Sequence, residues 1–369
     1  MSSDVVRGRF SWTLLVPLAA LVGLVATWGR KPGDLVLALV ALLLIGAVLA
    51  AVHHAEVVAH RVGEPFGSLV LAVAVTIIEV ALIVTLMVTA TGQETAGLAR
   101  DTVFAAVMIS VNGIVGLSLV VGALRHQFAV FNPEGAGSAL ATVVTLATLT
   151  LVVPTFTTSA SGPEFTSGQL TFAAVASLAL YGMFVFTQTV RHRDFFLPVE
   201  AGGSLPDEDD DGHADPPSGP QALTSLALLL GALVAVVGLA KVESPAIESA
   251  VAAVGFPHAV VGVVIALLVL LPESIAAVRA AARQHVQISL NLAYGSAMAS
   301  IGLTIPTIAV ASIWLDGPLE LGLGTTEMVL LLLSVIVAVL TVVPGRAKPL
   351  AGGIHLAILA SFIYFTIAP

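Results

Sequence analysis

Long apolar stretches dominate this chain. Eleven runs of about 20 residues are separated by charged or Pro/Gly-rich breaks, and a helix of about 20 apolar residues crosses the ~30 Å hydrocarbon core of a bilayer. Strands of a membrane barrel would alternate instead. Only 10% of the residues are charged and 57% are hydrophobic, whereas roughly a quarter of a soluble domain is charged. The sequence therefore predicts an all-α, polytopic membrane protein with 11 transmembrane helices.

Most connections between the predicted spans are short, and the exception is the segment 191–220. It carries an Asp/Glu run at 207–211 among Pro and Gly and has few apolar residues, so it is expected to be a flexible acidic linker. The spans are expected near 11–28, 34–53, 66–90, 102–124, 136–156, 168–190, 221–241, 257–282, 287–314, 324–344 and 349–367.

The distribution of Lys and Arg predicts the orientation, because cytoplasmic loops carry an excess of these residues. With 11 spans, ten of the 14 basic residues map to the N-terminal side of the membrane and four to the other side. We therefore expect a multi-pass protein of a bacterial inner (plasma) membrane. Its N-terminus and its 191–220 linker would be cytoplasmic and its C-terminus external. Arg7 and Arg9 precede the first span without a clear cleavage site, so that span is expected to be retained.

The linker separates six predicted spans from five. With an N-terminal helix in residues 1–33 set aside, residues 34–190 and 221–369 each hold five spans. An odd number of spans forces the second five-helix repeat to enter the membrane inverted relative to the first. Many secondary transporters use this arrangement and bind their substrate near the midplane, where the repeats meet.

Two glutamates, Glu79 and Glu273, lie deep inside apolar runs, each in the second span of its repeat. A charged side chain in hydrocarbon costs on the order of a few kcal/mol, so it persists where it has a partner or a task. One alternative is a protonated carboxyl that hydrogen-bonds to a neighbouring helix. Their matching positions favour a functional pair that binds a cation or protons.

The spans that follow the two glutamates also resemble each other. Aligning Gly116 with Gly302 places Ser110 opposite Ser296 and Ser118 opposite Thr304. Such small residues are typical of close helix packing, and their hydroxyls can also serve as polar partners. The candidates for a polar lining around the glutamates are Thr76, Ser110, Asn112, Ser296 and Ser300. His355 lies inside the last predicted span, where one hydrogen bond to a carbonyl would satisfy its ring.

Two carboxylates that face each other in a cavity repel, so the pair has two favourable neutral states: protonated, or occupied by a cation. Hard cations such as Ca²⁺, Na⁺ and K⁺ prefer oxygen ligands. Pro272, directly before Glu273, removes one helical hydrogen bond and can free an upstream carbonyl. If protons and a metal cation compete for Glu79 and Glu273, alternating access makes that competition an antiport. No cofactor and no covalent chemistry are required.

Several motifs resemble a known family. Gly63-Glu64-Pro65-Phe66-Gly67 followed by Val75-Thr76-Ile77-Ile78-Glu79 is similar to the first signature of the bacterial calcium/proton and sodium/proton antiporters of the ChaA type, within the cation/proton exchanger family of the calcium/cation antiporter superfamily. The second signature is similar to Pro272-Glu273-Ser274 and to residues 287–306, and the segment from Phe131 to Ala136 also has the character of these proteins.

The resemblance implies that the helices of Glu79 and Glu273 carry the cation-binding carboxylates, with protons as the countersubstrate. It implies export of Ca²⁺, or of Na⁺ or K⁺, through a lipid bilayer. The wider exchanger family often has Gly-Asn four and three residues before each Glu. Here these positions are Val75-Thr76 and Val269-Leu270, so the coordination shell of the wider family does not transfer residue by residue.

Other functional classes find less support in the sequence. Cysteine is absent, and there is no His-Glu-x-x-His zinc motif, no phosphate-binding loop and no basic stripe for nucleic acid. An enzyme is therefore not expected. The open alternatives are a Na⁺-driven Ca²⁺ exchanger of the same fold, a passive cation channel, and a membrane scaffold whose linker recruits a partner.

Overall fold

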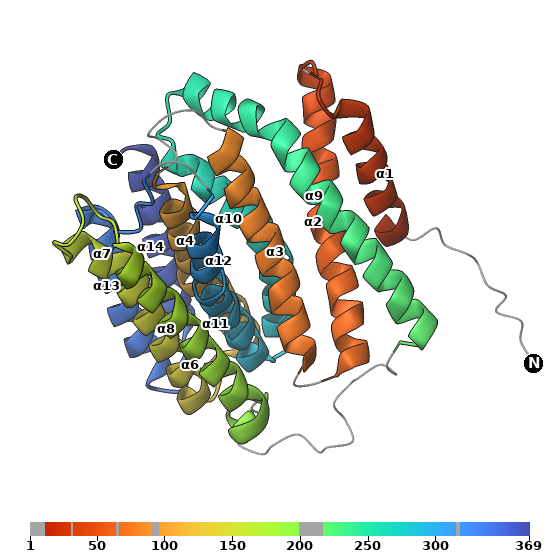
Figure 1. The fold of residues 1–369 in the computed structure, drawn as a ribbon. Coiled ribbons are helices and arrows are strands. Elements are labelled where there is room, and N and C mark those ends of the chain that lie inside the picture. Colours follow the sequence, from red (N-terminus) through yellow and green to blue (C-terminus); the bar gives the residue numbers. More distant parts are fainter. Residues whose placement is uncertain (1–11, 31, 64–65, 90–95, 199–216, 315–317) are drawn as a thin grey trace, which may run out of the picture. The chain divides into compact units, whose positions relative to one another are not determined.

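The computed structural model describes residues 12–30, 32–63, 66–89, 96–198, 217–314 and 318–369, and these are almost entirely helical (Figure 1). Among them, nine helices are long and apolar enough to cross a membrane, and two further apolar helices are shorter, Trp12–Thr27 and Val73–Val88. The predicted all-helical, polytopic architecture is confirmed. Most of the acidic linker, 199–216, and the basic residues Arg7 and Arg9 lie outside the described residues.

Each predicted span corresponds to one helix or to one interrupted helix. The elements are α1 Trp12–Thr27, α2 Asp34–Val62, α3 Phe66–Thr89, α4 Leu98–Met108, η2 Ile109–Ile114, α5 Val115–His126, β1 Ala129–Val130, α6 Pro133–Ala147, η3 Thr148–Val152, α7 Val153–Phe156, α8 Ser167–Phe186, η4 Thr187–Arg191, η5 Arg193–Phe196, α9 Gly219–Val254, α10 Ala259–Ala282, α11 Val286–Gly302, α12 Thr304–Ala311, α13 Thr325–Val342, β2 Arg346–Ala347 and α14 Pro349–Ile367.

Two helices run well past their predicted ends. The helix α2 continues from residue 53 to Val62, and α9 continues from residue 241 through Pro245 to Val254. Hydropathy reports where an apolar run ends. A helix satisfies its own backbone hydrogen bonds and can therefore continue into polar sequence, as it does here through Ala- and Glu-containing turns.

Two helix starts follow from local chemistry. The side chain of Asn132 accepts hydrogen bonds from the backbone N–H groups of Glu134 and Gly135, and Pro133 occupies the first turn of α6. Thr166 and Gln169 form a capping box at the start of α8. In both cases a side chain satisfies backbone donors that have no partner inside the helix.

The described residues fall into two packing units, divided at Ala74, at the 199–216 segment and at Glu243. The first unit holds α1, α2, the start of α3 and most of α9. In it, small residues allow close approach, since a Cβ at Gly46 would meet Val16 and a Cβ at Gly238 would meet Leu24. These units describe packing and do not test the predicted repeats at 34–190 and 221–369, which stay a prediction.

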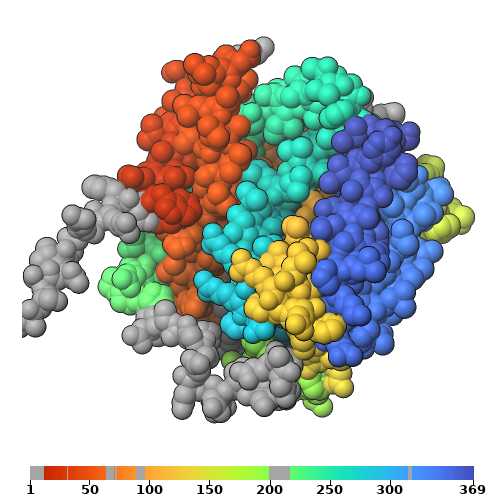
Figure 2. Space-filling model, turned by 180° about the vertical axis from the view of Figure 1, so that it is seen from behind, coloured from red at the N-terminus to blue at the C-terminus, as the bar shows by residue number. Residues whose placement is uncertain are grey.

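The second packing unit is built around the interrupted helix α4–η2–α5. It packs against α10, α11 and α14. In its apolar 18-residue stretch, 89% is buried inside the protein. Gly116 and Gly352 permit the approach of α5 and α14, because a Cβ on either would meet backbone atoms of the other. Figure 2 shows the dark blue α14 beside the yellow α5.

Both helices that follow the glutamate helices lose regular α-geometry. In η2, the N–H of Val115 bonds to the carbonyl of Ser110, five residues back, which is the π-helical pattern. The helix α11 ends at Gly302, and α12 begins at Thr304. Pro306 explains this break, because it has no N–H to offer the carbonyl of Gly302 and its ring crowds that carbonyl.

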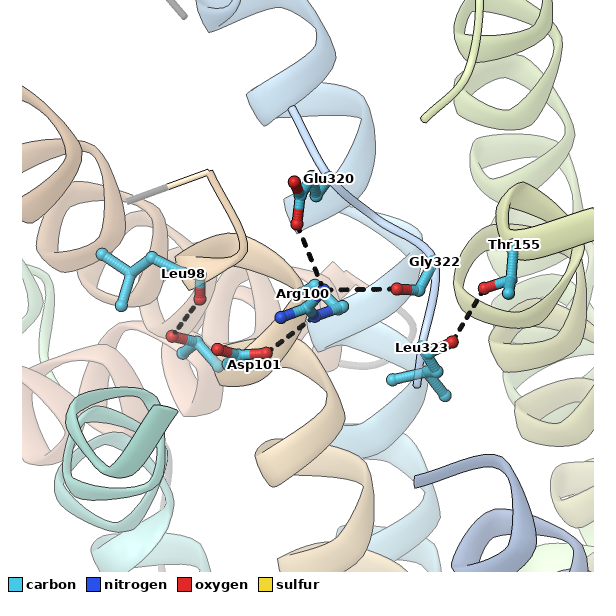
Figure 3. A network of polar contacts seen from close by, with 8 residues as sticks. Leu98, Arg100, Asp101, Thr155, Glu320, Gly322 and Leu323 are labelled. Carbon is cyan, nitrogen blue, oxygen red and sulfur yellow. Dashed lines mark hydrogen bonds and ion pairs between the residues drawn. The ribbon is translucent and has the colours of Figure 1, made fainter. Parts of the chain in front are cut away.

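Arg100 joins the start of α4 to the segment that precedes α13 (Figure 3). Its Nε lies 2.7 Å from Asp101 Oδ1, and its Nη1 lies 3.3 Å from the carbonyl of Gly322 and 3.5 Å from Glu320 Oε2. The Thr155 hydroxyl donates to the carbonyl of Leu323 at 2.8 Å. Three segments that are distant in the sequence are thereby held together.

Replacing Arg100 by Gln is expected to lower the melting temperature of the purified protein. The Arg100 and Asp101 side chains are 22% and 18% exposed, and a hydrogen bond to a charged group contributes about 1.5–3 kcal/mol. The double variant Arg100→Gln, Asp101→Asn should recover part of the loss, because the carboxylate that lies nearest to Arg100 is then neutral. The exposed Arg283→Gln serves as the control, and equal melting of the Arg100 and Arg283 variants would contradict the expectation.

Candidate functional site

Both glutamates predicted from the sequence are buried in the second packing unit. Glu79 lies on α3 and is 2% exposed, and Glu273 lies on α10 and is 6% exposed. Neither carboxylate therefore faces lipid. That placement is the first requirement for a cation-binding role, because carboxylates inside membrane proteins face the bundle interior or a water-filled cavity.

Glu79 has a specific partner from the other half of the chain. The hydroxyl of Ser300, on α11, donates to Glu79 Oε2 at 2.9 Å across 221 residues of sequence. The hydroxyl of Thr304 faces the same carboxylate but lies outside hydrogen-bond geometry. The structure thus brings together two residues predicted for the site, Glu79 and Ser300, and adds Thr304 beside them.

The break between α11 and α12 determines what this carboxylate meets. Ser300 lies in the last turn of α11, and Thr304 is the first residue of α12. The two residues therefore stand on either side of the break at Leu303. Because Pro306 withholds a donor, the carbonyl of Gly302 also lacks its normal helical partner. Hydroxyl and carbonyl oxygens are the kinds of ligand that hard cations accept in addition to carboxylates.

Glu273 follows Pro272 inside the continuous helix α10. Pro272 has no N–H, so the carbonyl of Leu268, four residues earlier, loses its helical donor. The α10 helix packs against α4, η2, α5 and α11. Glu273 therefore belongs to the same bundle of helices as the Ser300 partner of Glu79. That Glu79 and Glu273 form one site stays a prediction.

The other candidates divide into two groups. Thr76 and Ser110 are buried, and their hydroxyls have no hydrogen-bond partner among the described residues; the same holds for Ser118. Ser296 is half-buried. A buried hydroxyl without a partner costs free energy, about 1–3 kcal/mol. Several of them on helices that pack around the glutamates fit a polar lining for a ligand.

Asn112 has side-chain partners that the sequence did not predict. It lies in η2 and is fully buried, and its side chain contacts Ser334 on α13 and His355 on α14. Asn112 is therefore held by the last two helices of the chain. Little in the sequence pointed to these contacts. A histidine inside an apolar helix, His355, indicated that a buried polar partner exists. Nothing in the sequence around Ser334 and Thr341 indicated that they lie near it.

No group of three or more His, Cys, Asp or Glu side chains that could hold a metal ion occurs in the described part of the chain. The oxygens beside Glu79 are instead those of the Ser300 and Thr304 hydroxyls. Such a set of oxygens suits hard cations and not the softer metals that select thiolate or imidazole ligands.

A sequence profile of the sodium/calcium exchanger protein family matches residues 33–190 and 224–368. The chain belongs to this family. The two matched segments contain Glu79 and Glu273 and leave out the whole acidic linker, 191–220. Because the family consists of ion exchangers, the expectation of a transporter and not an enzyme is confirmed.

Individual proteins support the assignment over nearly the whole chain. The sodium-potassium/proton antiporter ChaA of Escherichia coli is 34% identical over 366 residues, 98% of each chain. A candidate ionic transporter of Sinorhizobium fredii, y4hA, is 46% identical over 362 residues, 97% of this chain and 96% of its own. The resemblance to ChaA-type antiporters is thereby confirmed.

The fold is also found in solved structures. Native YfkE matches with a TM-score of 0.72 and 16% identity, over 97% of this chain and 99% of its own. The H⁺/Ca²⁺ exchanger CAX matches with a TM-score of 0.66 and 16% identity, over 96% and 89% of the two chains. At this level of identity the matches show a shared membrane fold.

Proposed function

We propose that this protein is a secondary cation/proton antiporter that exports Ca²⁺, or alternatively Na⁺ or K⁺, in exchange for protons. The exchange takes place at a site near the midplane built on Glu79 and Glu273. The observation that carries the proposal is the buried Glu79 carboxylate, which accepts a hydrogen bond from Ser300 of the other half of the chain. A hydroxyl donor to a buried carboxylate favours its ionised, cation-binding form.

The proposed cycle uses competition and no covalent step. In one facing state, protons neutralise the two carboxylates. In the other, one Ca²⁺ displaces both protons, or one Na⁺ or K⁺ displaces a single proton, and the cation is held by carboxylate and hydroxyl oxygens. Because each occupied state is electrically compensated and the empty charged pair is unfavourable in the membrane interior, the site changes its exposure mainly when it is loaded. That condition couples the cation to the proton.

The proposed architecture is one initial helix, residues 1–33, and two inverted five-helix repeats, 34–190 and 221–369, joined by the 191–220 linker. Glu79 and Glu273 each lie on the second helix of a repeat. The third helices, α4–η2–α5 and α11–α12, are both interrupted. The N-terminus and the linker are proposed to be cytoplasmic and the C-terminus external, in a bacterial plasma membrane.

The candidate cations follow from the names of two relatives and from the oxygen ligands that the proposed site offers. The Escherichia coli relative is named a sodium-potassium/proton antiporter, and a relative from Aphanothece halophytica, 24% identical over 283 residues, is named a Ca²⁺/H⁺ antiporter. Two carboxylates with neutral oxygens can serve either class, since Ca²⁺ takes six to eight oxygen ligands and accepts carbonyls and water among them. The transport assay therefore compares all three cations.

Everted membrane vesicles that contain the protein test the proposal. An imposed pH gradient alone should drive accumulation of labelled Ca²⁺, Na⁺ or K⁺, and the cation flux should in turn move protons. Accumulation of Ca²⁺ that requires a Na⁺ gradient and ignores pH would identify a Na⁺-driven exchanger. Cation flux that follows its own gradient without moving protons would identify a channel.

Ser300→Ala should raise the cation concentration at half-maximal exchange about tenfold or more. The variant removes the hydroxyl that stabilises the ionised Glu79 carboxylate, and a hydrogen bond to a charged group contributes about 1.5–3 kcal/mol. Ser312→Ala is the matched control, because its hydroxyl donates only to the backbone of its own helix, at Ala309. Unchanged half-saturation in Ser300→Ala would remove this hydroxyl from the site.

A further inference from the structure

His355 is a fully buried histidine in the last helix, α14, and the exchange cycle described above makes no use of it. Its ring lies between two side chains. His355 Nδ1 is 3.1 Å from Asn112 Oδ1, and His355 Nε2 is 3.2 Å from Thr341 Oγ1.

The hydrogen bonds around this ring run in one direction. The hydroxyl of Ser334 donates to the carbonyl of Leu330 at 2.7 Å, so it accepts from Asn112 Nδ2 at 2.9 Å. The amide oxygen of Asn112 then faces His355, and because an oxygen of this kind only accepts, the hydrogen must be on Nδ1. In a neutral imidazole, Nε2 is left to accept from Thr341.

This chain of donors ties α13 and α14 to the π-helical turn η2. The η2 turn also packs against α10, which carries Glu273, and against α11, which carries Ser300. Ser110, whose buried hydroxyl has no partner among the described residues, is the second residue of the same turn. The orientation of Asn112 and the shape of the turn therefore bear on the helices that carry the proposed site.

We propose that His355 is a positioning residue for cation binding: its neutral imidazole, with the hydrogen on Nδ1, orients the Asn112 side chain and holds the π-helical turn η2 against the Glu273 and Ser300 helices. The proposal rests on the proposed cation/proton exchange. It assigns no proton-carrying role to His355. It predicts that cation affinity depends on the donor at the Nδ1 position and much less on the acceptor at Nε2.

Two amide substitutions separate these positions. The amide of His355→Asn lies near the position of Nδ1 and can still donate to Asn112. The longer side chain of His355→Gln carries its amide near the position of Nε2 and cannot. We expect His355→Asn to keep half-saturation within about threefold of the unaltered chain. His355→Gln and His355→Leu should raise it about tenfold, with less effect on the maximal rate.

The assay uses the full chain in everted vesicles, with Na⁺, K⁺ and Ca²⁺ tested separately and with the amount and melting temperature of each variant measured. Ser361→Ala, whose hydroxyl donates only to the backbone of Ala357 on the same helix, is the control. The double variant Asn112→Leu, His355→Leu should lose no more affinity than Asn112→Leu alone, because the imidazole acts through Asn112.

Unaltered half-saturation in His355→Gln would overturn the proposal. So would equal losses in the Asn and Gln variants, since a general need for the imidazole volume would then explain both. If the proposed function itself is wrong, the result is different: the unaltered chain then shows no proton-coupled flux of any of the three cations. That result would overturn both proposals, whereas the first two overturn only the positioning role of His355.

Discussion

Glu79→Gln is expected to abolish most proton-coupled cation exchange while the protein still inserts into the membrane. Gln has nearly the same size and can still accept from the Ser300 hydroxyl, but it cannot ionise and so cannot exchange a proton for a cation. Removing one partner of a buried charge interaction costs on the order of 2–5 kcal/mol, which corresponds to about 30-fold or more in affinity. Flux in everted vesicles, normalised to protein content, measures the loss.

The control for this variant is Glu134→Gln, an exposed glutamate at the start of α6. It should exchange cations at the rate of the unaltered chain. Glu79→Asp adds a graded comparison, because it keeps the charge but withdraws the carboxylate from Ser300 by about one carbon–carbon bond. Normal coupled transport in Glu79→Gln would exclude Glu79 from the mechanism, whatever its burial.

Glu273→Gln should produce a loss of similar size. The carboxylate lies on α10 directly after Pro272 and is buried. If both glutamates act as one site, the double variant Glu79→Gln, Glu273→Gln should be no worse than either single variant, because groups that act as a unit are strongly non-additive. The same vesicle flux assay, applied to the three variants, checks this.

Ser274→Ala is the neighbouring control, since its hydroxyl donates to the carbonyl of Leu270 in its own helix. It should transport normally. Two independent sites would give losses that multiply in the double variant. That outcome, or full activity of Glu273→Gln, would contradict a shared site even if Glu79 proved essential.

The helical spans could be predicted because each is an apolar run of membrane length, and the bilayer allows such a run few other conformations. The burial of Glu79 and Glu273 followed from the same physics, since a carboxylate inside such a run must face protein or water. The ends of α2 and α9 could not be predicted in this way, because both helices continue through polar residues beyond the hydrophobic run.

Contacts between distant helices were harder to predict. Ser300 as the partner of Glu79 was one of several small residues that fit a polar lining, and the sequence did not distinguish it from Ser296. Asn112 stays a candidate for the same lining, and its bonds to Ser334 and His355 could not be predicted from the sequence. Which face of a helix meets which neighbour depends on packing between residues more than 200 positions apart. The π-helical turn η2 has no recognisable sequence motif.

Proton release from the purified protein tests most directly whether a cation and protons compete for Glu79 and Glu273. Na⁺, K⁺ or Ca²⁺ is added separately to the protein in a weakly buffered solution with a pH-sensitive dye, and the released protons are counted as a function of pH. If they compete, the transported cation releases protons from the unaltered chain and not from the double variant Glu79→Gln, Glu273→Gln. Cation binding without proton release, or equal release from the double variant, would contradict it.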